Sequence, residues 1–401
     1  MNAYRVLFSN RGVARVLSSQ LFARLPLGLF SIGILMHVEA LTDSFATAGL
    51  VVASVSVGQA TIMPLASRLA GVVGARRLVK LAASAHAASS VGLALCGPAE
   101  GPLIALGLLV GATVPPLMPV VRALYPRIVP PSSVPALFAV DTIIEELIWI
   151  IGPVAATLLV ASLAPPAPMF ACSAITLAGT LWFIASPAIA SLSLPRAVSH
   201  FGRVLGSRPL LVGMVTSLLL VGSFMALEVA IVVKSDLDPL VAGLAIAMSC
   251  LGSLIGGLGF GHRRLGVPGT MLALGVVAAG TALTGLSDNP VVLAAGLLLS
   301  GLGFAPALSM IYVMVSRTTA EDATAEAFGW LTTSNLVGGA AGTAMGGLFA
   351  DVSGTGGVFL FSTALAWLAT AAPGLARLGG PLPGLSRSAD LRDIPTKKRV
   401  K

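Results

Sequence analysis

The feature that most constrains this chain is a series of unbroken apolar runs, each about 20 residues long. At 1.5 Å per residue, a helix of that length spans a hydrocarbon core of roughly 30 Å. A membrane β-barrel would instead alternate apolar and polar residues in segments of about ten. Hydrophobic residues make up 56% of the chain and charged residues 10%, whereas soluble domains carry about 25% charged residues. The sequence therefore predicts an all-α integral membrane protein.

The apolar runs predict about twelve transmembrane helices. Their expected ranges are 16–38, 46–66, 77–97, 102–122, 137–161, 166–186, 209–233, 241–260, 268–286, 290–315, 326–348 and 355–373. A polar connection separates two groups of about six, which favours two pseudo-symmetric six-helix bundles with a substrate site between them. The expected domains are an N-terminal bundle (1–190), a cytoplasmic central loop (191–208), a C-terminal bundle (209–375) and a basic cytoplasmic tail (376–401).

The basic residues indicate the orientation. Of the 24 lysines and arginines, all but Lys234 and Arg24 fall in segments on one side of the predicted helices. Because cytoplasmic segments are enriched in Lys and Arg, both termini are predicted to be cytoplasmic. The net charge of +8 then reflects topology, and no nucleic-acid binding is expected. The bias toward Arg, Ala and Gly is typical of a GC-rich bacterial genome, so we expect the protein to lie in the bacterial plasma membrane. We also expect it to function as a monomer.

Sequence patterns of catalytic and cofactor sites are missing. No glycine-rich loop is followed by Lys-Ser or Lys-Thr, and the glycine-rich residues 257–261 end a predicted membrane helix. The three cysteines and four histidines show no metal-ligand spacing. We therefore predict that the protein is not an enzyme and has no metal or cofactor.

The connection after the second predicted helix is short, rich in glycine and basic. Together with the six-plus-six layout, it resembles the major facilitator superfamily over residues 10–375. Gly74, Arg76 and Arg77 match that family's gating loop, while Gly71 stands where the family usually has aspartate. The resemblance implies a rocker-switch transporter with a central cavity, usually driven by a proton gradient.

Two further stretches are similar to a little-characterised bacterial branch of the same superfamily. One is residues 115–122, at the end of the fourth predicted helix, and the other is residues 141–153 on the fifth. The pair Gly152-Pro153 also resembles the fifth-helix signature of exporters, which implies export.

Ionisable residues inside the predicted helices are candidates for function, because each costs roughly 2.5–3.5 kcal/mol at the bilayer centre. Arg24, Glu145 and Glu146 lie at similar depths on helices that are neighbours in the superfamily. We expect Arg24 to pair with one of these glutamates or to anchor substrate. Consecutive helical residues point about 100° apart, so the other glutamate should face elsewhere. Asp141 is expected to pair with Arg122 near the membrane surface.

Glu228 lies in the outer third of the seventh predicted helix with no basic residue close in sequence. We expect Glu228 and one of Glu145 or Glu146 to carry protons, the alternative being a helix-packing hydrogen bond. Glu326, at the start of the eleventh predicted helix, is expected to favour the helix dipole rather than to bind substrate. Side chains that could line the central cavity are Gln20, Gln59, Trp149, Tyr312 and Asn335.

These features predict a secondary active transporter whose partners are a small organic molecule, protons and the lipid bilayer. Proton-coupled efflux is the preferred interpretation, and proton-coupled uptake by the same fold is the first alternative. A non-transporting membrane sensor or assembly protein is the second. Such a protein would normally show an attached domain or a long soluble loop.

Overall fold

The computed structural model describes residues 11–186, 200–234, 239–260, 266–286 and 289–377, and every regular element in these ranges is helical. The first part of the chain forms α2 (Arg11–Arg24), α3 (Pro26–Thr42), α4 (Phe45–Leu69), α5 (Ala75–Ala94), α6 (Glu100–Ala112), α7 (Leu117–Ile128), α8 (Val134–Ser162) and α9 (Ala167–Ile184). The second part forms α11 (Arg208–Lys234), α12 (Pro239–Phe260), α13 (Gly266–Gly285), α14 (Pro290–Thr318) and α15 (Thr324–Arg377). The predicted ranges overlap these helices, with three differences. Two predicted spans are each divided into two helices, and the last two predicted spans lie in one helix.

Proline and glycine determine the breaks. The first predicted span is divided at Leu25, and Pro26 begins α3, where its missing N–H group is not needed. The fourth is divided between α6 and α7, where Pro115 and Pro116 interrupt the helix. The last two predicted spans lie together in α15, which bends at Gly354 with φ 64° and ψ −169°. Glycine adopts that conformation at little cost because it has no Cβ.

Nine helical segments in the described ranges are long and apolar enough to cross a membrane. They are Gly12–Thr42, Thr47–Ala94, Glu100–Ile128, Val134–Ser162, Ala167–Ile184, Arg208–Lys234, Gly266–Gly285, Pro290–Thr318 and Val352–Leu375. Leu244–Phe260 is a shorter apolar helix. The protein is therefore a multi-pass membrane protein.

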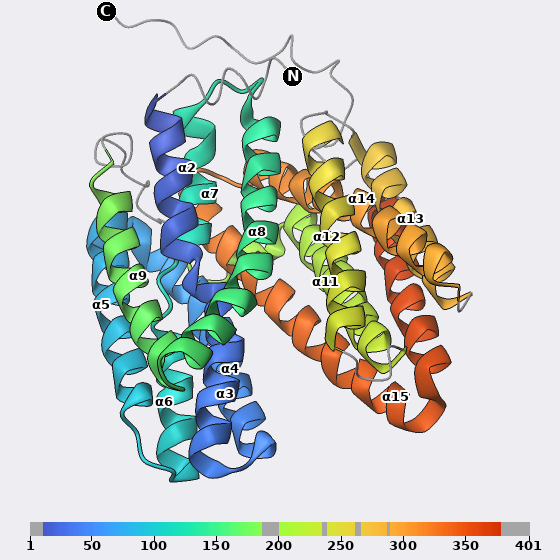
Figure 1. Cartoon of the computed structure of the whole chain (residues 1–401). Coiled ribbons are helices and arrows are strands. Elements are labelled where there is room, and N and C mark those ends of the chain that lie inside the picture. The colour runs from blue at the N-terminus through green and yellow to red at the C-terminus, as the bar shows by residue number, and fades with distance from the viewer. Residues whose placement is uncertain (1–10, 187–199, 235–238, 261–265, 287–288, 378–401) are drawn as a thin grey trace, which may run out of the picture.

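Figure 1 shows α2 to α9 on the left and α11 to α14 on the right, with α15 running from the middle to the lower right and back up. Within the first group, α4 packs along α6, and α9 contacts α2, α3 and α5. Within the second, α14 packs along α12 and α13, and α15 packs along α11. The two groups meet where α15 contacts α4 and α7, and where α8 contacts α12 and α14.

Glycines allow several of these helices to pack backbone to backbone. A Cβ at Gly342 of α15 would collide with the backbone of Gly222 on α11, and one at Gly252 of α12 would collide with that of Leu298 on α14. Burial alone does not drive helices together in lipid, so small residues at such contacts favour association by close packing. The largest buried apolar cluster lies where the two groups meet, and includes Tyr125, Phe138, Tyr312 and Phe328.

Candidate functional site, a buried charge network

Arg24 is the last residue of α2, and its side chain is 1% exposed. Its Nη1 donates to Oδ1 of Asp141 on α8 at 2.8 Å, and its Nη2 lies 3.8 Å from Oε2 of Glu145. The expected partner Glu145 is thus the more distant one, and Asp141 makes the short contact. The two carboxylates are four residues apart, so both project from the same face of α8.

Arg122 comes from α7 and binds the same two carboxylates. Its Nε donates to Oδ2 of Asp141 at 2.7 Å, and its Nη2 donates to Oε2 of Glu145 at 2.9 Å. The expected pairing of Asp141 with Arg122 is therefore present, and both side chains are buried inside the protein. The two side chains are 1% and 0% exposed, because Arg122 points inward from α7 and Tyr312 covers its guanidinium.

Two uncharged side chains complete the coordination of Asp141. The hydroxyl of Tyr125 donates to its Oδ1 at 2.8 Å and accepts a hydrogen bond from Nε2 of Gln20 at 2.7 Å. The same amide nitrogen lies 3.4 Å from Oδ1. Tyr125 is three residues after Arg122, so both lie on one face of α7. The carboxylate of Asp141 thus accepts hydrogen bonds from α2 and α7 together.

The second part of the chain covers this network with aromatic rings. The guanidinium of Arg122 lies 3.8 Å from the ring centroid of Tyr312 on α14, a cation–π contact. Phe138 of α8 packs against Tyr312 and against Phe328 of α15. Nδ2 of Asn335 lies 3.4 Å from the Tyr312 hydroxyl. The network therefore touches the helices on the other side of the interface.

The network contains two arginines and two carboxylates, so its formal charge is balanced. Burying an isolated charge is costly, whereas a paired and hydrogen-bonded one is tolerated. Leaving one buried partner unpaired typically costs about 3–5 kcal/mol. The four charged residues should therefore be considered as one unit.

Glu146 points away from this unit. Its Oε1 accepts a hydrogen bond from the hydroxyl of Ser253 on α12 at 3.0 Å. Glu228 lies on α11, which contacts α12. It is half-buried, and no hydrogen bond or ion pair involves its side chain within the described residues. Glu146 and Glu228 thus lie on two helices that both contact α12.

Charged contacts also close one end of the interface. Nη1 of Arg68 on α4 donates to Oε2 of Glu326 on α15 at 2.8 Å, and the backbone N–H of Gly202 donates to its Oε1 at 2.7 Å. Glu326 lies in the first turn of α15, as expected, and its side chain in addition joins α4 and Gly202 to α15. Nearby, Arg127 and Glu321 form a more exposed pair at 2.6 Å.

The predicted gating loop connects α4 to α5. Gly74 has a φ of 96°, a conformation that favours glycine, and it precedes the first turn of α5. Arg76 and Arg77 are exposed to the surroundings, whereas Arg68, at the end of α4, makes the contact across the interface. The segment thus contributes to closure through a residue outside the matched signature.

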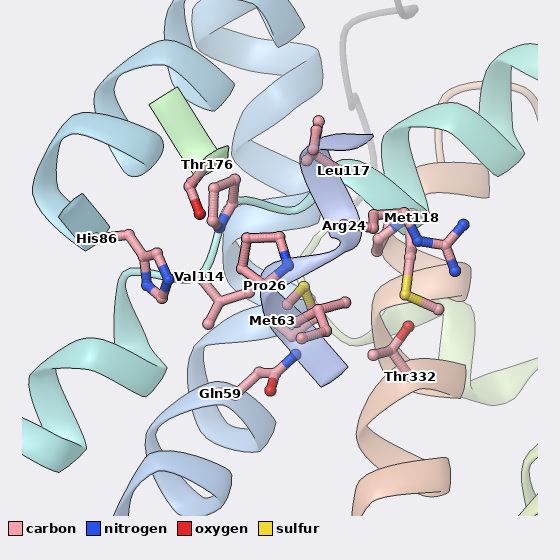
Figure 2. A pocket seen from close by; sticks show the side chains of 14 residues that line it. Arg24, Pro26, Gln59, Met63, His86, Val114, Leu117, Met118, Thr176 and Thr332 are labelled. Atoms are coloured by element: carbon pink, nitrogen blue, oxygen red, sulfur yellow. The ribbon is translucent and has the colours of Figure 1, made fainter. Parts of the chain in front are cut away.

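A cavity lies beside the network and is shown in Figure 2. Arg24 and Thr332 stand on one side of it and His86 on the other, with Gln59 between α4 and the cavity. Most of the remaining lining is apolar, including Leu27, Met63, Val114, Leu117 and Met118.

The residues expected to line a central cavity lie in three different places. Gln59 lines the cavity of Figure 2. Gln20, Tyr312 and Asn335 belong to the charge network or its aromatic cover. Trp149 does not line the cavity, because its side chain is 53% exposed on the outside of α8.

Sequence reasoning missed Tyr125, Phe138 and Phe328 as partners of the charged residues. A signal for Tyr125 existed, since the spacing Arg122-x-x-Tyr125 puts a polar pair on one helix face. The aromatic cover carried no such signal, because its members are distant in sequence. In the part of the chain that the structure describes, no group of three or more His, Cys, Asp or Glu residues could hold a metal ion.

The comparison with known protein families agrees with the family resemblance seen in the sequence. The sequence model of the Major Facilitator Superfamily matches residues 16–262 and 210–399. No curated protein sequence matches the chain significantly.

Several solved structures with a similar fold are described as transporters or homologues of transporters. The human organic anion transporter MFSD10 is 18% identical, with a TM-score of 0.74 over 90% of this chain and 99% of its own. A bacterial homologue of the iron transporter ferroportin, in an outward-facing state, is 16% identical, with a TM-score of 0.74 over 92% and 100%. The E. coli fucose:proton symporter FucP is 13% identical, with a TM-score of 0.73 over 90% and 98%. At these identities the similarity concerns the fold.

Proposed function

The chain belongs to the major facilitator superfamily, and from this premise we propose that it is a proton-coupled secondary active transporter of a small organic molecule. The observation that carries the proposal is the balanced charge network, which is buried where helices of the two parts meet. Ionisable groups inside a membrane protein commonly mark substrate or proton pathways. The family and the similar structures are transporters rather than enzymes.

The proposed architecture has about twelve spans in two six-helix bundles. In this arrangement α2 with α3 forms one span, α6 with α7 another, and α15 forms two. The bundles would occupy residues 1–190 and 209–375. Residues 191–199 of the central loop and 378–401 of the basic tail lie outside the described residues. Both termini would be cytoplasmic, in the plasma membrane of a bacterium, and the monomer would be the working unit.

This topology predicts which single cysteines react with a membrane-impermeant thiol reagent in intact cells. In a cysteine-free background, Leu163→Cys and Leu286→Cys should be labelled, because both exposed positions follow helices that end on the proposed outer side. Ser132→Cys, exposed between α7 and α8 on the proposed inner side, should be labelled only after permeabilisation. The reverse pattern would exclude the proposed orientation.

The contacts of Glu326 are proposed to hold the cytoplasmic side closed. Transport by rocking would require α4 and α15 to separate there, and so the Arg68–Glu326 contact to break. A hydrogen bond to a charged group contributes about 1.5–3 kcal/mol. The pair therefore biases the equilibrium between closed and open forms of this side.

Glu326→Gln should weaken closure and expose buried positions on the cytoplasmic side. Alkylation of Leu124→Cys, which is buried on α7, should become about tenfold faster, the equivalent of about 1.4 kcal/mol. The matched control is Glu321→Gln, whose pair with Arg127 is 82% exposed on the glutamate side and should matter little. Equal rates in the two variants would show that Glu326 does not bias closure.

Proton coupling is testable once a ligand is known. Screening small organic compounds by thermal shift identifies ligands, because a bound ligand stabilises the folded protein. In proteoliposomes, an imposed pH gradient should then drive accumulation of that compound. Absence of gradient-driven movement for every stabilising compound would contradict the proposal.

Two directions of transport are proposed. Gly152-Pro153, which resembles an exporter signature, supports efflux in exchange for protons. Uptake of the compound together with protons is the second candidate.

A further inference from the structure

Arg24 lies beside the cavity with part of its guanidinium unpartnered. Its Nη1 donates to Asp141, but Nε and Nη2 are buried and make no hydrogen bond within the described residues. A buried donor without a partner costs about 1–3 kcal/mol, so such groups call for an explanation. The Nε–H and one Nη2–H of a guanidinium point in parallel along one edge, which is the geometry that binds both oxygens of a carboxylate.

Glu145 does not satisfy this edge. Its Oε2 lies 3.8 Å from Nη2 of Arg24 and accepts its hydrogen bond from Arg122 instead. With an exposure of 22%, it is the most accessible of the four charged side chains, since those of Arg24, Arg122 and Asp141 are at most 1% exposed. Glu145 is therefore the least enclosed member of the network, although it does not itself line the cavity beside Arg24.

The cavity next to Arg24 determines what else a ligand needs. Its lining is mostly apolar, with Leu27, Val114 and Met118 among the side chains. The polar side chains there, besides Arg24, are Gln59, His86, Thr176 and Thr332. A ligand that matches both surfaces has an apolar body and one planar, negatively charged head group. The cavity has a free volume of about 20 Å³ in this conformation, so it must widen to admit such a ligand.

We propose that this site binds a small organic carboxylate with an apolar body, through the Nε and Nη2 edge of Arg24, and that Glu145 takes up one proton when the carboxylate binds. This inference rests on the proposed transport function and names its substrate class.

The proton follows from the balance of charge. The network is neutral with two arginines and two carboxylates, so a bound carboxylate adds one uncompensated negative charge. Groups facing Glu145 are Arg24 from α2, Arg122 from α7 and Tyr312 from α14. On its own helix, Asp141 lies one turn before it, and Glu146 is the next residue but points toward Ser253. Asp141 is enclosed by short contacts, so the proton from solution goes to Glu145. One carboxylate and one proton then bind together, and the net charge is unchanged.

Binding one proton together with the substrate determines the direction in which a proton gradient moves the substrate. When both leave together on the other side, the proton gradient drives the carboxylate inward. The site chemistry therefore selects the uptake form of the proposed function.

Binding of benzoate to the purified full-length protein tests this inference, with benzamide as a neutral compound of the same shape. Benzoate should raise Tm and benzamide should not, because the amide carries no charge for Arg24. The Kd for benzoate should increase about tenfold per pH unit between about pH 6 and about pH 8, since one proton is bound with the ligand. Arg24→Lys keeps the charge but loses the two-donor edge, so it should weaken benzoate binding about tenfold.

Glu145→Gln mimics the protonated side chain, and in this variant the Kd should be independent of pH and tighter than that of the unmodified protein at about pH 8. Glu100→Gln is the matched control, because Glu100 is an exposed glutamate of the same part that contacts Thr47, and it should retain the pH dependence. Equal binding of benzamide, or no stabilisation by benzoate, would overturn the inference. So would a pH dependence that persists in Glu145→Gln or disappears in Glu146→Gln instead.

These experiments distinguish failure of the proposed substrate class from failure of the proposed transport function. If amines or sugars bind in place of benzoate and move with protons, the substrate class is wrong and the transporter proposal stands. If benzoate binds as described but no pH gradient moves it, the binding site stands and proton-coupled transport is wrong.

Discussion

Asp141→Asn is expected to lower the free energy of unfolding by about 3–5 kcal/mol, because it leaves two buried arginines with one carboxylate between them. Both Arg24 and Arg122 hold Asp141 at 2.8 Å or closer, and neither side chain can reach water. The loss should be visible as a lower Tm of the detergent-solubilised protein and as reduced amounts of folded protein in size-exclusion chromatography.

A second substitution should restore part of the lost stability. Arg24→Gln alone should also destabilise the protein, but Asp141→Asn with Arg24→Gln leaves Arg122 paired with Glu145 and restores the balance of charge. The double variant should therefore lose clearly less than the sum of the two single losses. Glu100→Gln, outside the network, serves as the control. Additive losses would mean that the four charges do not act as one unit.

Glu228→Gln should abolish accumulation driven by a pH gradient while leaving exchange of substrate across the membrane intact. Glutamine resembles the protonated glutamate, so the two parts of the chain can still move, but no proton is taken up or released at this position. Glu228 suits this role because its side chain is half-buried and has no ionic partner in the described ranges. The measurement compares substrate uptake into proteoliposomes with and without the gradient.

The same assay separates Glu228 from the glutamates of α8. Full gradient-driven accumulation in Glu228→Gln would remove this residue from the coupling pathway. If Glu145→Gln and Glu146→Gln also retain full coupling, the proton-coupling proposal as a whole fails, leaving a uniporter or a carrier coupled to another ion. Loss of exchange as well as accumulation would point to a structural role for Glu228.

The candidate site shows how far sequence reasoning reaches. A charge within an apolar run is visible in the sequence, and so Arg24, Glu145, Glu146 and Glu228 could be named as candidates. Predicting which of these charged residues pair with one another was harder, because pairing depends on which helix faces meet. Asp141 and Glu145 lie on one face of α8 at a spacing of four residues, so either could have met Arg24, and only the packing of α2 and α7 against α8 places Asp141 closest.

By itself, the sequence determined that this is an all-helical multi-pass membrane protein, since lipid requires each span to be a continuous apolar helix with its backbone hydrogen bonds satisfied internally. Periodicity and length are local properties, and they are readable without a structure. Only the tertiary structure decided that Glu326 joins α4, α15 and Gly202, and that Tyr312 covers Arg122. These contacts join residues far apart in the chain, and their existence depends on distances between helices that no local pattern contains.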